Sequence, residues 1–115
     1  MPDDHSHQSM NPVEAQVKAY NAHDLDGFLA CYSRDIIIRD GEGSVLVQGI
    51  EEMRMQFSAL FQASPALHAK ILTRIDVGAY IVLEERIEGY DGEPLRGVMV
   101  YHQTGDTIDR AVWLT

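Results

Sequence analysis

Hydrophobic residues near the start of the chain recur at helical spacing. Val13, Val17 and Tyr20 are three or four positions apart, which places them on one face of a helix. Asn11 is a favourable N-cap, and Pro12 at the first helical position costs nothing because its missing N–H would be unpaired there. We therefore expect a first helix that begins near Asn11.

The same spacing predicts two more helices. Asp24 can cap a short second helix, and Gly49 precedes a third whose first turn carries Glu51 and Glu52, suited to the positive end of the helix dipole. Ser64-Pro65 ends the third helix. The predicted apolar faces are Leu25, Phe28, Leu29 and Tyr32 in the second helix, and Ile50, Met53, Phe57, Leu60 and Phe61 in the third.

Between these two helices the pattern favours a hairpin. Residues 36–38 are three isoleucines, residues 40–44 are rich in turn formers, and residues 45–47 are again apolar and mostly β-branched. After Pro65, four long apolar stretches are separated by turn signals at Gly78, Asp91-Gly92 and Gly105-Asp106. The predicted strands are Leu67–Val77, Tyr80–Gly89, Leu95–Gln103 and Ile108–Leu114.

Short links between strands favour antiparallel neighbours. The order is then helix, helix, hairpin, helix and a four-stranded meander, which indicates an α+β domain over residues 11–115. We expect the three helices of the N-terminal half to pack in a strongly curved antiparallel sheet. Residues 1–10 are polar and are expected to form a disordered arm.

Charge and composition exclude several classes of function. The 115 residues include 18 acidic and 9 basic side chains, a formal charge of −9, so the protein should repel nucleic acids and anionic membrane surfaces. No apolar run is long enough to cross a bilayer, and the N-terminal residues lack the pattern of a signal peptide. Cys31 is the only cysteine, which suits a reducing compartment. We expect a cytoplasmic protein.

The segment Tyr20–Phe28, which reads Tyr-Asn-Ala-His-Asp-Leu-Asp-Gly-Phe, adds a family to this picture. Together with the aromatic Tyr32, the acidic-Gly turn after the first strand and the order of elements, it resembles the NTF2-like superfamily, in its SnoaL-like and ketosteroid-isomerase-like branch. The resemblance implies a cone, in which a curved sheet encloses a pocket, and frequent dimers through the outer face of the sheet. That superfamily includes isomerases, cyclases, hydrolases, dehydratases and binding modules, so it does not fix the chemistry.

The resemblance also points to Asp40, which falls where isomerases of this kind keep their general base. A carboxylate that faces an apolar cavity gains a raised pKa and becomes a useful base. The alternative is that Asp40 only bonds the backbone of the hairpin turn. The two oxyanion donors of the isomerases align with Gln16 and Val98, so we expect negligible steroid isomerisation. Tyr20, one helical turn beyond Gln16, is a further catalytic candidate.

Glu85 and Arg110 form a second candidate pair. Glu85 alternates with Ile81, Leu83 and Ile87, so it is a charge in an apolar row and should be paired. Arg110 shares a predicted face with Ile108, Val112 and Leu114. It could neutralise Glu85 or Asp40, or bind a ligand carboxylate. The alternatives are the opposite strand register or an ion pair that only supports the structure.

His102 and His68 complete the acid–base candidates. The residues after the N-terminal arm contain no His-x-x-x-His or Cys-x-x-Cys spacing and no nucleotide-binding glycine motif, so we expect neither a metal nor a cofactor. The predicted ligand-binding residues are Gln16, Tyr20, Phe28, Tyr32, Phe57, Glu85, Arg110 and Trp113.

These features predict an apolar pocket for a small, largely apolar organic molecule. One interpretation is cofactor-free, isomerase-like acid–base catalysis with Asp40 as the base and Tyr20 or His102 as its partner. A second is a non-catalytic module for ligand binding or dimerisation. A third is a cofactor-free hydrolase or dehydratase, which requires Asp40 and Glu85 to face each other. Both faces of the meander carry apolar residues, which indicates a homodimer through the sheet.

Overall fold

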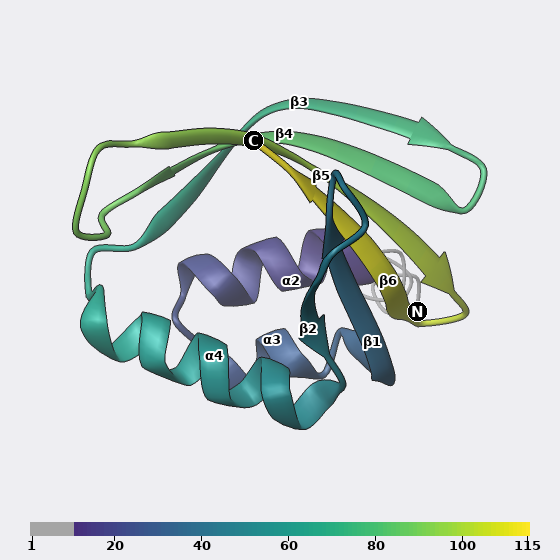
Figure 1. Cartoon of the computed structure of the whole chain (residues 1–115), viewed down its shortest axis with the longest axis horizontal. Helices are drawn as coiled ribbons and strands as arrows, with labels where there is room; N and C mark the ends of the chain where they lie inside the picture. Colours follow the sequence, from purple (N-terminus) through teal and green to yellow (C-terminus); the bar gives the residue numbers. More distant parts are fainter. Residues whose placement is uncertain (1–10) are drawn as a thin grey trace, which may run out of the picture.

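The structure is a computed structural model that describes residues 11–115; the arm expected over residues 1–10 lies outside the described residues. Three helices lie along one face of a six-stranded sheet (Figure 1). The helices are α2 (Pro12–Asn21), α3 (Leu25–Leu29) and α4 (Ile50–Ala63). The strands are β1 (Tyr32–Asp40), β2 (Val45–Gln48), β3 (His68–Val77), β4 (Tyr80–Glu88), β5 (Leu95–Thr104) and β6 (Thr107–Leu114).

The helix starts follow the predicted capping residues. The Asn11 side chain accepts a hydrogen bond from the Glu14 amide, and the Glu14 side chain accepts one from the Asn11 amide, which completes a capping box. Asp24 caps α3 by accepting from the Gly27 amide at 3.0 Å. The helix boundaries predicted from Asn11, Asp24 and Gly49 are therefore confirmed.

The sheet is mixed, which corrects the prediction of an antiparallel one. Its strand order is β2-β1-β6-β5-β4-β3, and β1 runs parallel to β6 while all other neighbours are antiparallel. The hairpin of β1 and β2 thereby joins the edge of the meander. The pairing links residues about seventy positions apart, as in Ile38 beside Ala111. No local turn motif predicts a contact between residues so distant in the sequence.

The sheet is also not strongly curled, contrary to the expected cone. The helices lie against β1, β2, β3 and β6, and the core includes Val13, Phe28, Ile36, Met53 and Ile108. The far half of β3 extends past this core, and its residues from Thr73 to Val77 are exposed. That part of the sheet has no helix to bend around.

A bulge in β6 decides which of its side chains face the helices. Along the β5–β6 pair, His102 lies opposite Arg110 but Gln103 lies opposite Ile108, so Asp109 is the extra residue. Ile108 is fully buried under the helices, whereas Arg110 is exposed on the opposite, outer face. The face shared by Ile108 and Arg110 was therefore wrongly predicted, because simple alternation fails at the bulge.

Candidate functional site

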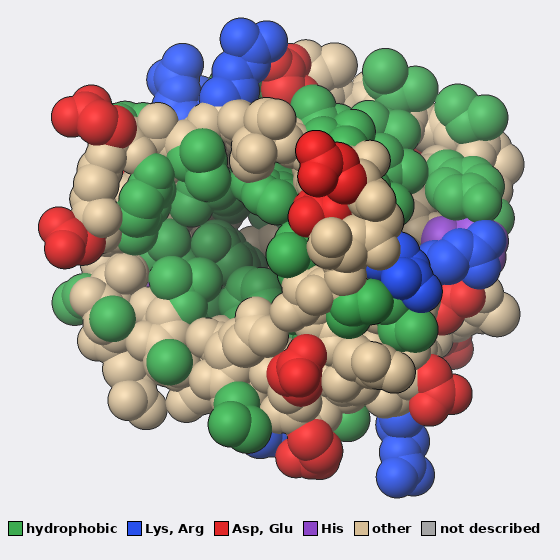
Figure 2. Space-filling model, in the orientation of Figure 1, with side chains coloured by type: hydrophobic (Ala, Val, Ile, Leu, Met, Phe, Trp, Pro, Cys, Tyr) green, Lys and Arg blue, Asp and Glu red, His purple; other side chains and the backbone are tan. Residues whose placement is uncertain are grey.

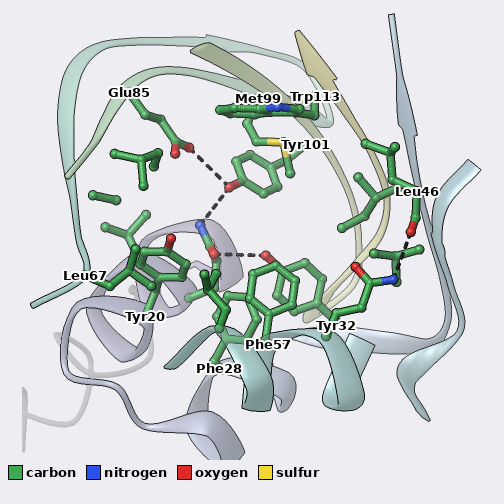
Figure 3. A pocket seen from close by; sticks show the side chains of 18 of the residues that line it. Tyr20, Phe28, Tyr32, Leu46, Phe57, Leu67, Glu85, Met99, Tyr101 and Trp113 are labelled. Carbon is green, nitrogen blue, oxygen red and sulfur yellow. Dashed lines mark hydrogen bonds between the residues drawn. The ribbon is translucent and has the colours of Figure 1, made fainter. Parts of the chain in front are cut away.

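A pocket opens between the helices and the inner face of the sheet, with a volume of about 350 Å³ (Figures 2 and 3). Its wall is largely hydrophobic, and Figure 2 shows a hollow lined with apolar side chains. Aromatic residues come from every layer: Tyr20 on α2, Phe57 on α4, Tyr101 on β5 and Trp113 on β6. The other lining residues are Gln16, Val17, Phe28, Tyr32, Ile38, Leu46, Val47, Gln56, Leu60, Leu67, Ala69, Glu85, Ile87, Tyr90, Leu95 and Met99.

Glu85 brings the only carboxyl group to this wall among the described residues. It projects inward from β4 between the buried Leu83 and the partly buried Ile87, as its alternation predicted, and it is 6% exposed. No lysine, arginine or histidine of the described chain lines the pocket. Burial without a counter-charge raises the pKa of Glu85 to about 7, while a hydrogen bond from Tyr101 opposes part of the rise.

A chain of hydrogen bonds leads from Glu85 across the pocket (Figure 3). The Tyr101 hydroxyl donates to Glu85 Oε2 at 3.4 Å, and Gln16 Nε2 donates to the Tyr101 hydroxyl at 3.0 Å. The Tyr32 hydroxyl donates to Gln16 Oε1 at 2.9 Å. All four side chains are buried, and burial raises the pKa of both Tyr32 and Tyr101 well above the usual value. The two tyrosines therefore act as neutral hydrogen-bond donors.

Tyr20 lies on the same side of the pocket as Glu85. Its hydroxyl points into the cavity, and it has no hydrogen-bond partner among residues 11–115 (Figure 3). The pKa of Tyr20 is raised, mainly by burial and to a smaller extent by the negative charge of the nearby Glu85. Its ring is held by Phe28 and Phe61, with centroids 5.9 and 5.6 Å away. The Tyr20 hydroxyl is therefore neutral and available to donate a hydrogen bond to a ligand beside the buried carboxyl.

Asp40 does not reach the pocket, which corrects the expected placement of the base. The strand register puts it beside Trp113, on the inner face, but its Oδ1 accepts from the Glu42 and Ser44 amides at 2.9 Å each. Asp40 is half-exposed at the β1–β2 turn and does not line the cavity. The turn amides hold the carboxylate, which is the alternative that the sequence left open. Asp40 and Glu85 therefore do not form a carboxylate pair.

His102 and Arg110 lie on the outer face of the sheet, away from the pocket. His102 Nδ1 is 2.6 Å from Asp109 Oδ1, and the Arg110 guanidinium donates to the Tyr80 hydroxyl at 3.2 Å. The His102 ring also packs edge-on against Tyr80. Neither side chain can reach Glu85 from that face. His68 is exposed at the start of β3 and does not line the pocket.

The other predicted ligand-binding residues do come together. Seven of the eight line the pocket, and Arg110 is the exception. They are Gln16, Tyr20, Phe28, Tyr32, Phe57, Glu85 and Trp113.

Sequence reasoning missed Tyr101, although it contacts both Gln16 and Glu85. Tyr101 and Met99 are two positions apart and both project inward from β5, so alternation along this strand could have indicated Tyr101. Which face of β5 points inward, however, depends on the strand register, and the sequence alone does not show it.

Residues 11–115 contain no group of three histidine, cysteine, aspartate or glutamate side chains placed to hold a metal ion. No helix there is both long and apolar enough to span a membrane.

A family model of the SnoaL-like domain matches residues 13–111, nearly the whole chain. The protein belongs to the SnoaL-like family. Solved structures agree that it has the NTF2-like, ketosteroid-isomerase-like fold. A comparison with functionally curated proteins gave no match.

Three solved structures illustrate the likeness. An uncharacterised cystatin-fold protein from Novosphingobium aromaticivorans is 29% identical, with a TM-score of 0.83 over 90% of this chain and 95% of that one. A protein of Sinorhizobium meliloti, provisionally named a polyketide cyclase, is 18% identical, with a TM-score of 0.76 over 89% and 92%. A hypothetical protein of Catenulispora acidiphila, solved with trimethylamine, is 17% identical, with a TM-score of 0.71 over 89% and 82%.

Proposed function

We propose that this SnoaL-like protein binds a compact, largely apolar organic molecule and exchanges a proton with it through Glu85, without a cofactor. The observation that carries the proposal is the buried Glu85 carboxyl in an apolar pocket, with a pKa of about 7. A carboxyl group with such a pKa takes up and releases protons at neutral pH, as general acid–base catalysis requires. The base is then Glu85 rather than Asp40.

The size of the cavity limits the ligand. A volume of about 350 Å³ lies at the small end of the range of about 300–1,000 Å³ that is usual for pockets of small organic ligands. The trimethylamine bound in the Catenulispora acidiphila structure is also small. A compact organic molecule suits this space.

The arrangement suits proton transfer next to a carbonyl group. The Glu85 carboxylate takes the proton from the carbon beside the carbonyl, and the electron pair of that C–H bond moves toward the carbonyl oxygen. The Tyr20 hydroxyl donates a hydrogen bond to this oxygen as its negative charge develops. Glu85 then returns the proton. Return to the same carbon gives hydrogen exchange or inversion, and return to another carbon gives an isomer; neither changes the oxidation state.

Hydrogen exchange in D2O tests this step directly. The protein is incubated with compact cyclic ketones, and loss of the α-proton signal is followed by NMR. We expect exchange that rises with pH up to about 7 and then levels off, because only the ionised Glu85 acts as a base. Glu85→Gln should slow it about 100-fold or more.

Glu84→Gln is the matched control, since this neighbouring side chain lies on the outer face, where it bonds Thr73 and Arg96. It should leave the exchange rate unchanged. Exchange that persists in Glu85→Gln would refute the assignment of the base. Saturable ketone binding without exchange would favour the second candidate, a non-catalytic ligand-binding module, which the otherwise apolar wall of the pocket also suits.

A homodimer through the outer face of the sheet is also part of the proposal. Ile75, Val82, Val100 and Val112 are direct cross-strand neighbours and form one apolar row over β3, β4, β5 and β6. Ile75 is 53% exposed, and Val77 beside it is 61% exposed. Such a continuous apolar row is typical of a surface that is covered by a second copy.

A further inference from the structure

The hydrogen-bond chain from Tyr32 to Glu85 connects four elements that are far apart in the sequence. Tyr32 is on β1, Gln16 on α2, Tyr101 on β5 and Glu85 on β4. Each link is a single hydrogen bond, of 2.9, 3.0 and 3.4 Å in that order (Figure 3). In residues 11–115 Tyr32 makes no direct hydrogen bond to Glu85, so any influence of its hydroxyl on the carboxyl through hydrogen bonding passes through Gln16 and Tyr101.

The direction of the chain depends on the Gln16 amide. An amide has one end that only accepts and one end that only donates. The Tyr32 hydroxyl donates to Oε1, which turns Nε2 toward Tyr101. Because Nε2 offers only hydrogens, the Tyr101 oxygen accepts there, and the hydrogen of Tyr101 is left for Glu85.

The opposite amide orientation would have the opposite effect. Gln16 Oε1 would then face Tyr101 and accept its hydrogen, and Glu85 would lose its donor. The Tyr32 hydrogen would also lose the Gln16 oxygen that accepts it at 2.9 Å and would face the hydrogens of Nε2 instead. An unpaired buried polar group is costly, so the Tyr32 hydroxyl selects the observed orientation.

We propose that Tyr32 is a positioning residue: its hydroxyl orients the Gln16 amide, and this orientation forces the Tyr101 hydroxyl to donate to the Glu85 carboxylate. Tyr32 thereby controls the charge state of the pocket from a distance. The catalytic consequence rests on the proposed function, but the effect on Glu85 itself is measured without any ligand. Failure of the two proposals can therefore be told apart.

Few other groups can influence the titration of Glu85. The ionisable side chains that face the pocket from the described elements are Tyr20 on α2, Tyr32 on β1, Tyr101 on β5 and Tyr90 in the β4–β5 loop. No basic side chain of these elements lines the cavity. Changes in the Glu85 titration that follow substitution of Tyr32, Gln16 or Tyr101, with Tyr20 and Tyr90 left in place, can therefore be assigned to this hydrogen-bond chain.

The test is a carbon-13 NMR titration of the Glu85 carboxyl group in the full-length protein, assigned with Glu85→Gln. Tyr101→Phe removes the donor itself and should raise the proton affinity of Glu85 about tenfold, or about one pH unit. Tyr32→Phe frees the amide to turn, so it should raise the affinity at least about fivefold. Tyr80→Phe removes a hydroxyl from the outer face and should change nothing.

The decisive variant is Tyr32→Phe combined with Gln16→Met. With no amide to compete, the Tyr101 hydroxyl keeps Glu85 as its only acceptor, so the titration should return to within about twofold of the wild-type midpoint. A merely structural role of Tyr32 predicts no such rescue by a second substitution. A wild-type midpoint in Tyr32→Phe, or a raised midpoint that survives in the double variant, would overturn the proposal.

Gln16→Met alone keeps the proposal testable if Tyr32→Phe does not fold. We expect a midpoint close to wild type for this variant, in contrast to the raised midpoint of Tyr101→Phe. A midpoint raised as far as in Tyr101→Phe would mean that Gln16 acts by its own polarity, and the orientation mechanism would be wrong.

Discussion

Replacing Glu85 with glutamine should change how the stability of the protein depends on pH. Folding buries the Glu85 carboxyl without a counter-charge, and its pKa rises from 4.5 to about 7. The folded protein therefore binds this proton more tightly than the unfolded chain does. Proton binding by Glu85 therefore contributes to the free energy of unfolding. This contribution is complete below pH 4.5 and is lost as the pH rises through 7. Glutamine keeps the shape and the hydrogen-bond acceptor but has no proton to lose.

The size of the effect follows from this shift. Each unit of pKa difference corresponds to about 1.4 kcal/mol. Integrated from pH 5 to pH 8, a shift from 4.5 to about 7 lowers the free energy of unfolding of the wild type, relative to Glu85→Gln, by about 2.5 kcal/mol. Most of the change should fall between pH 5 and pH 7.

Urea denaturation of both proteins at half-unit steps of pH measures this difference. Glu84→Gln serves as the control, because Thr73 and Arg96 lower the pKa of Glu84 and its contribution to stability is lost only in more acidic solution. The difference between wild type and Glu84→Gln should stay flat from pH 5 to pH 8. A similarly flat difference for Glu85→Gln would show that Glu85 is solvated or paired, and the basis of the proposed acid–base role would be lost.

Three further predictions concern the ligand and the assembly. A β,γ-unsaturated ketosteroid should not be isomerised, because Gln16, which aligns with an oxyanion donor of the isomerases, already donates to Tyr101; steady growth of conjugated-enone absorbance above a no-enzyme blank would contradict this. By calorimetry at pH 8, 4-tert-butylcyclohexanone should bind at least about tenfold more tightly than 4-tert-butylcyclohexanecarboxylate, since the pocket offers a carboxylate and no basic group; equal affinities would be inconsistent with a charged Glu85 in the wall. Light scattering at micromolar concentration should give a dimer mass for the wild type and a monomer mass for Val100→Arg, which places a charge in the middle of the apolar row; a monomeric wild type would rule out the dimer.

The sequence predicted the parts of the site that depend on local periodicity. Alternation on β4 placed Glu85 on the same face as Leu83 and Ile87, and helical spacing placed Tyr20 and Phe57 toward the pocket. These signals need no knowledge of distant contacts, because the side-chain direction repeats every two residues in a strand and every 3.6 in a helix.

The parts that failed depend on register and on competition for hydrogen bonds. Arg110 faces outward because a bulge at Asp109 shifts the alternation of β6, and a bulge leaves no clear mark in the sequence. Asp40 was assigned from its position in the family pattern, but two turn amides capture its carboxylate. The contact between Gln16 and Tyr101 joins residues 85 positions apart, which only the assembled sheet brings together.

The close packing of Trp113 against Gly97 has a practical consequence. A Cβ atom at position 97 would lie 2.4 Å from the indole, so glycine there allows the ring to lie flat on β5 in the pocket wall, one strand away from Glu85. Trp113 is the only tryptophan of the chain, and all of the protein's indole fluorescence therefore originates at this wall. The pocket contains its own optical probe: an apolar guest that displaces water from the indole should shift the emission to shorter wavelength, and a library of compounds can be screened without labelling the protein.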